Sequence, residues 1–338
     1  EPMLKLLGTD AKVMHLSLPY VQWMLAGSPL LFFYIIYTSI LRGVGDSVTP
    51  LIALSLTSLI GLAVTPVLLK GYFGFPALGI VAPAIATILG YAAVLIFLGF
   101  YLNYKNHPLK IDARLLQSIR HDATLSKLIL KLGIPTGIQM VTTSLAGLVI
   151  IGLVNHYGAH ATAAYGAVNQ VLNYIQFPAL SISIAASIFA AQAIGAGKPD
   201  LLAKVTRTAL GMNVIFTGSL ITLAYLFSKY LMALFITDHS VIELGQQLLF
   251  IVLWAVLFFG ASAIFASIMR ASGTVNVPMM INILTIILIE VPCAYWFSSL
   301  WGLTGIWTAY ALSFVCLSIL KAYYYQLIWK RTKIKVLI

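Results

Sequence analysis

One acidic side chain lies deep within an apolar run. Of the nine Asp and Glu residues, only Glu290 lies well inside such a run, 12 residues into segment 278–299. A carboxylate at that depth is costly to ionise unless a proton or cation neutralises it. Pro292 follows and weakens the helix backbone, because it lacks an amide N–H. We therefore predict that Glu290 is the cation-coupling residue, although an acid near the outer water layer, or a structural partner for a hydroxyl, would fit the same position.

A polar stripe runs along the apolar segment 163–195. Asn169, Asn173 and Gln176 follow the spacing i, i+4, i+7, so a helix places them on one face. Gln170 lies beside the stripe and Tyr165 lies one turn earlier. Such a face suits hydrogen bonds and a cation–π contact to a substrate in a watery cavity. It equally suits contacts between membrane helices, which are worth about 0.6 kcal/mol per hydrogen bond.

Isolated polar residues in other segments extend this set. We expect three further amides to contribute to the same cavity: Gln139, Gln192 and Asn282. Two similar connectors, "LRGVGDSVTP" at 41–50 and "MRASGTVNVP" at 269–278, carry Arg42, Asp46 and Arg270. These three are candidates for a connector or gating role on the cytoplasmic side.

The composition indicates the elements that must position these residues. Hydrophobic residues make up 61% of the chain, charged residues 9%, and the mean hydropathy is +0.98, whereas soluble domains carry about 25% charged residues. The long runs do not alternate, which argues against barrel strands. We predict an all-α polytopic membrane protein with nine transmembrane helices, at 18–41, 50–70, 77–104, 132–154, 163–195, 205–228, 241–269, 278–299 and 303–328.

The 20 Lys and Arg residues set the expected orientation. Most fall in connections that share one side of the membrane, whereas Lys5, Lys12, Lys70 and Lys229 fall on the other. The basic side is then cytoplasmic, so we expect a multi-pass protein of the plasma (bacterial inner) membrane with a cytoplasmic C-terminus. This arrangement accounts for the net charge of +11 without a nucleic-acid partner. It groups Lys321 with the basic residues at or beyond the end of the last span, and it assigns no basic residue to the inside of any span.

The chain also repeats itself. A shift of 228 residues places Arg42 on Arg270, Gly45 on Gly273 and Pro50 on Pro278. Equal orientation of the copies predicts a parallel repeat. We expect three spans of one six-helix lobe in 1–104, a cytoplasmic and partly helical linker in 105–131, and a complete six-helix lobe in 132–338. Three spans would then precede residue 1.

Several blocks resemble the multidrug and toxic compound extrusion (MATE) transporters: "LRGVGDSVTP", "GFPALGIVAPAIAT" (74–87), "KLGIPTGIQM" (131–140) and, most specifically, residues 163–198. The resemblance implies twelve helices in two lobes around a central cleft, of which this chain holds helices four to twelve. It implies export of small organic, often cationic compounds in exchange for H⁺ or Na⁺. We expect no other cofactor, a monomer, and membrane lipids around it.

The chain departs from the resemblance at positions that many family members use for coupling. Thr143 stands where many carry a Glu, and Gly61 and Thr65 stand where many carry an Asn-x-x-x-Asp pair. The coupling ion therefore stays open between H⁺ and Na⁺.

Two alternatives to drug export remain. A lipid-linked oligosaccharide flippase has the same broader fold, but its pyrophosphate would favour basic residues inside the spans. A non-transporting membrane fragment is the other. The sequence contains no zinc-protease, phosphate-loop or Cys/His-cluster motif, so we do not expect an enzyme.

Overall fold

The computed structural model describes residues 11–110 and 122–331, and its regular elements are all helical. The first part contains α2 (Ala11–Gly43), α3 (Val48–Lys70), η1 (Tyr72–Gly74), η2 (Gly79–Val81) and α4 (Ala82–Tyr104). The second contains α6 (Ala123–Asn155), α7 (Ala159–Gly195), α8 (Leu201–Leu226), α9 (Ser228–Ala233), α10 (His239–Val252), η3 (Leu253–Ala255), α11 (Val256–Ala271), α12 (Asn276–Thr285), η4 (Ile286–Glu290), α13 (Val291–Trp301), α14 (Leu303–Leu327) and η5 (Trp329–Arg331).

The described residues form nine helices that are long and apolar enough to cross a membrane. Three of these spans are composite: η2 and α4 form one, α10, η3 and α11 form the second, and α12, η4 and α13 form the third. The prediction of an all-α polytopic membrane protein is thereby confirmed.

Local capping moves some helix boundaries. α6 begins at Ala123, nine residues before the expected start of that span, because Asp122 caps it. The Asp122 Oδ1 atom accepts hydrogen bonds from the backbone N–H groups of Thr124 at 2.7 Å and Leu125 at 3.1 Å. Part of the expected linker, residues 111–121, lies outside the described residues.

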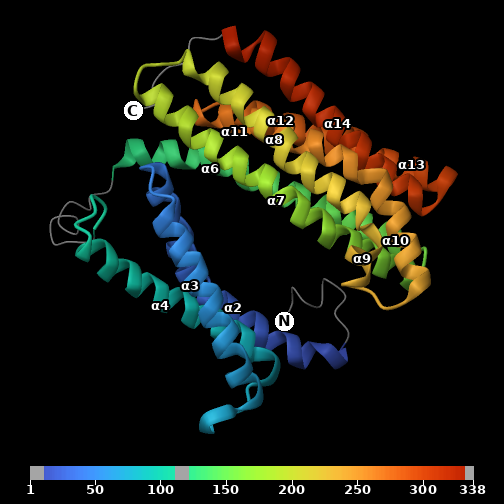
Figure 1. Ribbon diagram of the computed structural model, residues 1–338, viewed down its shortest axis with the longest axis horizontal. Coiled ribbons are helices and arrows are strands. Elements are labelled where there is room, and N and C mark those ends of the chain that lie inside the picture. The colour runs from blue at the N-terminus through green and yellow to red at the C-terminus, as the bar shows by residue number, and fades with distance from the viewer. Residues whose placement is uncertain (1–10, 111–121, 332–338) are drawn as a thin grey trace. The chain divides into compact units, whose positions relative to one another are not determined.

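The chain divides into two compact units, residues 1–121 and 122–338. In the first unit, α2, α3 and α4 pack together around Tyr34, Ala53, Val94 and Leu98 (Figure 1). Gly90 on α4 lies close to Thr57 on α3, and a Cβ atom at this position would be 3.3 Å from the Thr57 side chain.

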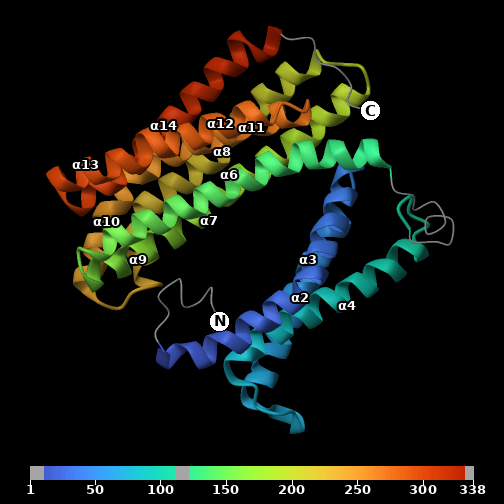
Figure 2. The same cartoon turned by 180° about the vertical axis from the view of Figure 1, so that it is seen from behind.

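The second unit is built around α7 and α11, whose contact is supported by α8 and α14 (Figure 2). Gly260 on α11 lies against Asn213 of α8 and Ala179 of α7, and a side chain at this position would clash with both. The Asn213 Nδ2 atom donates to the Leu257 carbonyl at 3.1 Å, and the Thr217 hydroxyl donates to Asn213 Oδ1 at 3.0 Å. Small residues and interhelical hydrogen bonds are the usual means of packing helices in lipid.

The two similar connectors adopt the same turn. In the first, Gly45 N donates to the Arg42 carbonyl at 3.0 Å, and Asp46 N donates to the Leu41 carbonyl at 3.0 Å. In the second, Gly273 N donates to Arg270 at 2.9 Å, and Thr274 N donates to Met269 at 3.1 Å. Every pair of equivalent positions is 228 residues apart, and both glycines have left-handed backbones, with φ of 93° and 82°. The two copies of the predicted repeat therefore have equivalent backbone hydrogen bonds in these turns.

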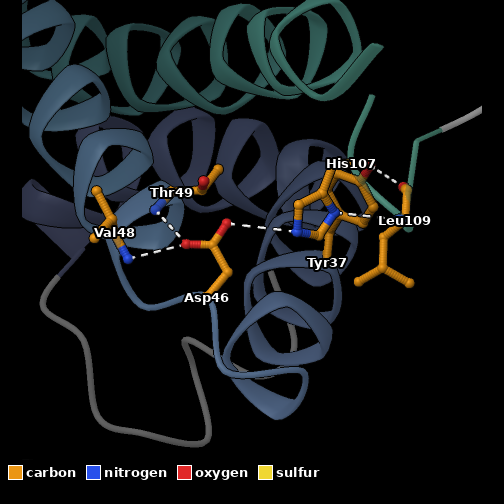
Figure 3. Close-up of polar contacts among 6 residues, drawn as sticks. All are labelled: Tyr37, Asp46, Val48, Thr49, His107 and Leu109. Carbon is orange, nitrogen blue, oxygen red and sulfur yellow. Dashed lines mark hydrogen bonds and ion pairs between the residues drawn. The ribbon is translucent and has the colours of Figure 1, made fainter. Parts of the chain in front are cut away.

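Asp46 ties the first connector together (Figure 3). Its Oδ1 atom accepts from the backbone N–H groups of Val48 at 3.1 Å and Thr49 at 3.0 Å, which caps α3. Its Oδ2 atom lies 3.7 Å from His107 Nε2, beyond the end of α4. The Tyr37 hydroxyl donates to the Leu109 carbonyl at 3.0 Å, so the same segment also contacts α2. Asp46 thus links the first connector to the start of α3 and to the segment that follows α4, and Tyr37 links that segment to α2.

The other connector residues have different partners. Arg42 donates to the Ser39 hydroxyl on its own helix at 3.0 Å. In the second connector, the Trp329 indole N–H donates to the Ser272 hydroxyl at 3.0 Å, so this turn also contacts the segment after the last helix of its unit.

We predict that Asp46→Ala destabilises the first unit at neutral pH by about 1 kcal/mol. Asp46→Asn should keep most of the wild-type stability, because an Asn side chain also caps helices. Partial burial raises the pKa of the Asp46 carboxyl, but hydrogen bonds from Thr49, the nearby His107 and a hydrogen bond from Val48 outweigh it, so the pKa lies below its usual 3.8.

A carboxyl group with a depressed pKa stabilises the fold above its unfolded-state pKa and loses that effect as the pH falls through the folded-state pKa. The difference in melting temperature between the wild type and Asp46→Ala should therefore be full at neutral pH and shrink below pH 3.8. A pH-independent difference in detergent melting curves would contradict the assignment of Asp46 as an ionised cap.

Candidate functional site

The second unit encloses a cavity of about 610 Å³ between its helices. The lining comes from α6, α7, α11, α12, η4 and α14, and it is mixed in character. Its polar and charged members are Thr136, Gln139, Thr143, Tyr165, Asn169, Asn173, Gln176, Ser262, Arg270, Asn282, Glu290, Tyr310 and Lys321. A cavity of this volume is in the range of small-molecule sites.

Glu290 forms the acidic region of this cavity. The side chain is only 8% exposed, and the Ser313 hydroxyl of α14 donates to its Oε2 atom at 2.9 Å. Glu290 ends the π-helical turn η4, where the Val291 N–H reaches back five residues to the Ile286 carbonyl. Pro292 has no N–H to continue the regular pattern, which accounts for the irregular turn. Such turns often lie at functional sites in membrane helices.

Lys321 forms a second charged region, and it corrects a prediction. The sequence placed Lys321 with the residues after the last span and left the spans without basic residues. That was wrong: Lys321 lies inside α14, six residues before its end, and is 3% exposed. Its Nζ atom donates to Ser262 Oγ on α11 and to Asn282 Oδ1 on α12, each at 2.9 Å. These oxygens solvate the ammonium in place of water, which is why it can be buried.

Arg270 lies at the same end of the cavity, in the last turn of α11. It is close enough to Lys321 for the two positive charges to repel. Within residues 11–110 and 122–331, no carboxylate makes an ion pair with Arg270 or Lys321, and no acceptor hydrogen-bonds the Arg270 guanidinium. The charges at this end are therefore not neutralised by the described protein groups.

Aromatic rings form a wall along α7 and α14. The Tyr165 and Tyr310 hydroxyls lie 3.0 Å apart, and the Tyr165 and Trp307 rings are 5.3 Å apart. Phe314 follows Tyr310 along α14 and packs against Phe259 of α11 at 5.2 Å. Phe314 and Leu317 lie between the levels of Ser313 and Lys321 on the same helix, so apolar surface separates the acid from the cation.

The structure brings most of the sequence-predicted site residues to this one cavity. Glu290, Arg270 and six of the neutral candidates line it: Gln139, Tyr165, Asn169, Asn173, Gln176 and Asn282. Gln170 and Gln192 are exposed and lie outside the lining. Arg42 and Asp46 belong to the first unit.

The sequence did not reveal the lining residues Lys321, Ser262 and Tyr310, nor Ser313, which donates to Glu290 from outside the lining. Lys321 carried a usable signal, because its position falls inside the expected span 303–328 rather than in a connection. Within the part of the chain that the structure describes, no group of three or more His, Cys, Asp or Glu side chains is placed to hold a metal ion.

Comparison with known proteins now decides the family. A family model described as MatE matches residues 1–67 and 135–296. The chain belongs to the MatE family. Members of this family are transporters, which is consistent with the nine apolar helices among the described residues and with the cavity between helices of the second unit.

Two curated relatives and one solved structure are similar to this MatE chain. It is 43% identical to the "Probable multidrug resistance protein YoeA" of Bacillus subtilis strain 168, over 99% of this chain and 73% of that protein. It is 27% identical to a "FAD transporter" of Shewanella oneidensis, over 98% and 73%. A mutant of the Vibrio cholerae MATE transporter VcmN has the same fold, with a TM-score of 0.88 and 19% identity, over 98% of this chain and 74% of VcmN.

We predict strong coupling between Asn282 and Lys321. Asn282→Leu removes one acceptor from a buried ammonium, which should lower the free energy of unfolding by about 1–3 kcal/mol. In Asn282→Leu/Lys321→Met the charge is absent, so the loss should be much smaller than the sum of the two single changes. Chemical unfolding of the four proteins in detergent micelles measures this cycle. Additive effects would contradict the contact.

Proposed function

We propose that the protein is a secondary antiporter that exports small organic compounds through the cavity of its second unit, driven by a proton gradient at Glu290. The observation that carries the proposal is a buried carboxylate lining a cavity of substrate size. The MatE family and the name of the Bacillus relative support multidrug transport as the broader activity.

The contacts of Glu290 suit a proton carrier. Its carboxylate accepts a hydrogen bond from the Ser313 hydroxyl, which stabilises the ionised form, while its burial favours the neutral form. Opposing effects of this kind allow a carboxyl group to bind a proton from one side of a membrane and release it to the other. A substrate that occupies the cavity would displace water from Glu290 and change this balance.

An alternating-access cycle supplies the coupling. Substrate and proton would occupy the cavity in turn. Protonation of Glu290 removes the negative charge that a substrate meets, and a bound substrate changes how readily Glu290 takes up a proton. We propose that the protein acts as a monomer in the plasma membrane. The bias of Lys and Arg toward one side supports a cytoplasmic C-terminus.

A flippase for a phosphate-bearing lipid is a second candidate, since the structure removes the sequence argument against it. Lys321 and Arg270 both line the cavity, so basic groups do face its interior. The relative named as an FAD transporter carries, by its name, a compound with two phosphates. Substrates of this family fold are therefore not confined to organic cations.

We predict that Glu290→Gln lowers proton-driven efflux at least about tenfold, because glutamine has the shape of the protonated acid but cannot release a proton. The assay loads proteoliposomes of the full-length protein with a fluorescent substrate such as ethidium and imposes H⁺ or Na⁺ gradients separately. Glu243→Gln is the matched control, because the Glu243 side chain is 63% exposed in the same unit.

Three results would overturn parts of this proposal. Unchanged proton-driven efflux in Glu290→Gln would remove Glu290 from the coupling step. Efflux driven only by Na⁺ would replace the proton as coupling ion. Absence of transport of any tested compound by the wild type would favour the non-transporting alternative.

A further inference from the structure

We propose that the Lys321 and Arg270 end of the cavity binds an anionic group, such as a phosphate or carboxylate, on a small aromatic substrate. The inference rests on the proposed transport function and names the chemical class of its substrate. It runs against the expectation, drawn from the sequence resemblance, of mainly cationic compounds.

The first support is the unused hydrogen-bonding capacity of Lys321. An ammonium group has three N–H donors, and Ser262 and Asn282 accept from two of them at 2.9 Å. Both acceptors are neutral, so they solvate the ammonium without neutralising it. The remaining donor belongs to a side chain that lines the cavity. An anion there would satisfy both the donor and the charge.

Arg270 provides the second support. Its guanidinium carries five N–H donors in a planar fork that matches two oxygens of a phosphate or carboxylate. No described side chain accepts from it, and the nearby Lys321 repels it. Two like charges at one end of a cavity favour an anion more than either alone. The charged residues of the described lining are these two cations and Glu290, so the cavity is net positive when Glu290 is ionised.

Glu290 is too far along the helices to serve as the missing counter-ion. Glu290 accepts a hydrogen bond from Ser313 on α14. Lys321 lies about two turns further along α14 than Ser313, or about 12 Å at 1.5 Å per residue. The same separation holds on the partner span, where Asn282 contacts Lys321 and Glu290 contacts Ser313. Phe314 and Leu317 lie between the two levels.

The cavity surface between Glu290 and Lys321 determines which chemical group the substrate carries besides its anion. The aromatic residues Tyr165, Tyr310 and Phe314 line the cavity. Flat aromatic rings stack well on such walls, whereas acyl chains gain nothing from leaving the surrounding lipid for them. We therefore assign the anionic group to a small aromatic compound and not to a lipid.

The test compares two flavins that differ by one phosphate. Riboflavin and flavin mononucleotide share the same ring and ribityl chain, and their fluorescence reports binding to the purified full-length protein in phosphatidylcholine nanodiscs. We expect the wild type to bind flavin mononucleotide at least about tenfold more tightly than riboflavin, as one charge-assisted contact provides. Equal affinities, or a preference for riboflavin, would overturn the proposal.

Variants assign the preference to residues. Lys321→Met and Arg270→Gln should each reduce the phosphate preference severalfold, measured in each variant as the ratio of its flavin mononucleotide and riboflavin affinities. Arg270→Gln serves as the second variant if Lys321→Met fails to fold, since no described side chain depends on the guanidinium. Lys127→Met is the matched control, because Lys127 is exposed on α6 outside the cavity lining. A preference that survives both cavity variants would overturn the assignment.

Two further arms separate the competing explanations. Loss of flavin mononucleotide binding in nanodiscs that contain phosphatidylglycerol would show that a lipid headgroup takes the site, against our assignment to a small molecule. Because binding is measured without a gradient, its outcome is independent of transport. A phosphate preference without efflux would contradict only the transport function, and efflux without the preference would contradict only the anion site.

Discussion

The buried ammonium of Lys321 constrains how the helices of the second unit pack together. A charge that is 3% exposed must be solvated by protein atoms, and here Ser262 on α11 and Asn282 on α12 converge on it from two neighbouring helices. A second contact, from Ser313 to Glu290, joins the same pair of spans about two turns away. Together the two contacts fix how α14 lies against the α12–η4–α13 span. The pairing that satisfies the charges also sets their separation, so the cavity acquires an acidic region and a basic region divided by aromatic surface.

The internal repeat includes the two connector turns but not the polar residues of the cavity. The connectors at Gly45 and Gly273 have equivalent hydrogen bonds. With the shift of 228 residues, however, Glu290 corresponds to Leu62 and Asn282 to Leu54, and Lys321 falls near Leu95 in the two-residue-gapped part of the repeat. In the first unit, Leu54 and Leu62 are exposed on α3, whereas Leu95 packs against the apolar cluster of Tyr34, Val94 and Leu98. The turns are therefore repeated in both units, whereas Glu290, Asn282 and Lys321 have apolar counterparts in the first unit.

Much of the fold follows from the sequence because a bilayer requires long apolar helices, and the nine expected spans all form. The polar stripe was also predictable, since Asn169, Asn173 and Gln176 share a face by helical spacing alone, and they line one cavity. Spacing could not show that the neighbouring Gln170 faces away from it. Nor could it pair Lys321 with Ser262, 59 residues earlier, or Asp46 with His107. Such contacts depend on how helices distant in sequence pack together.

The central claim is that the acid and the cation of the cavity are separate groups with separate partners. A cryo-electron microscopy map of the full-length protein with flavin mononucleotide tests it most directly. We expect the phosphate within hydrogen-bonding distance of the Lys321 and Arg270 side chains, with Glu290 still hydrogen-bonded to Ser313. A map in which Lys321 forms an ion pair with Glu290, or in which the phosphate lies away from both cations, would contradict it.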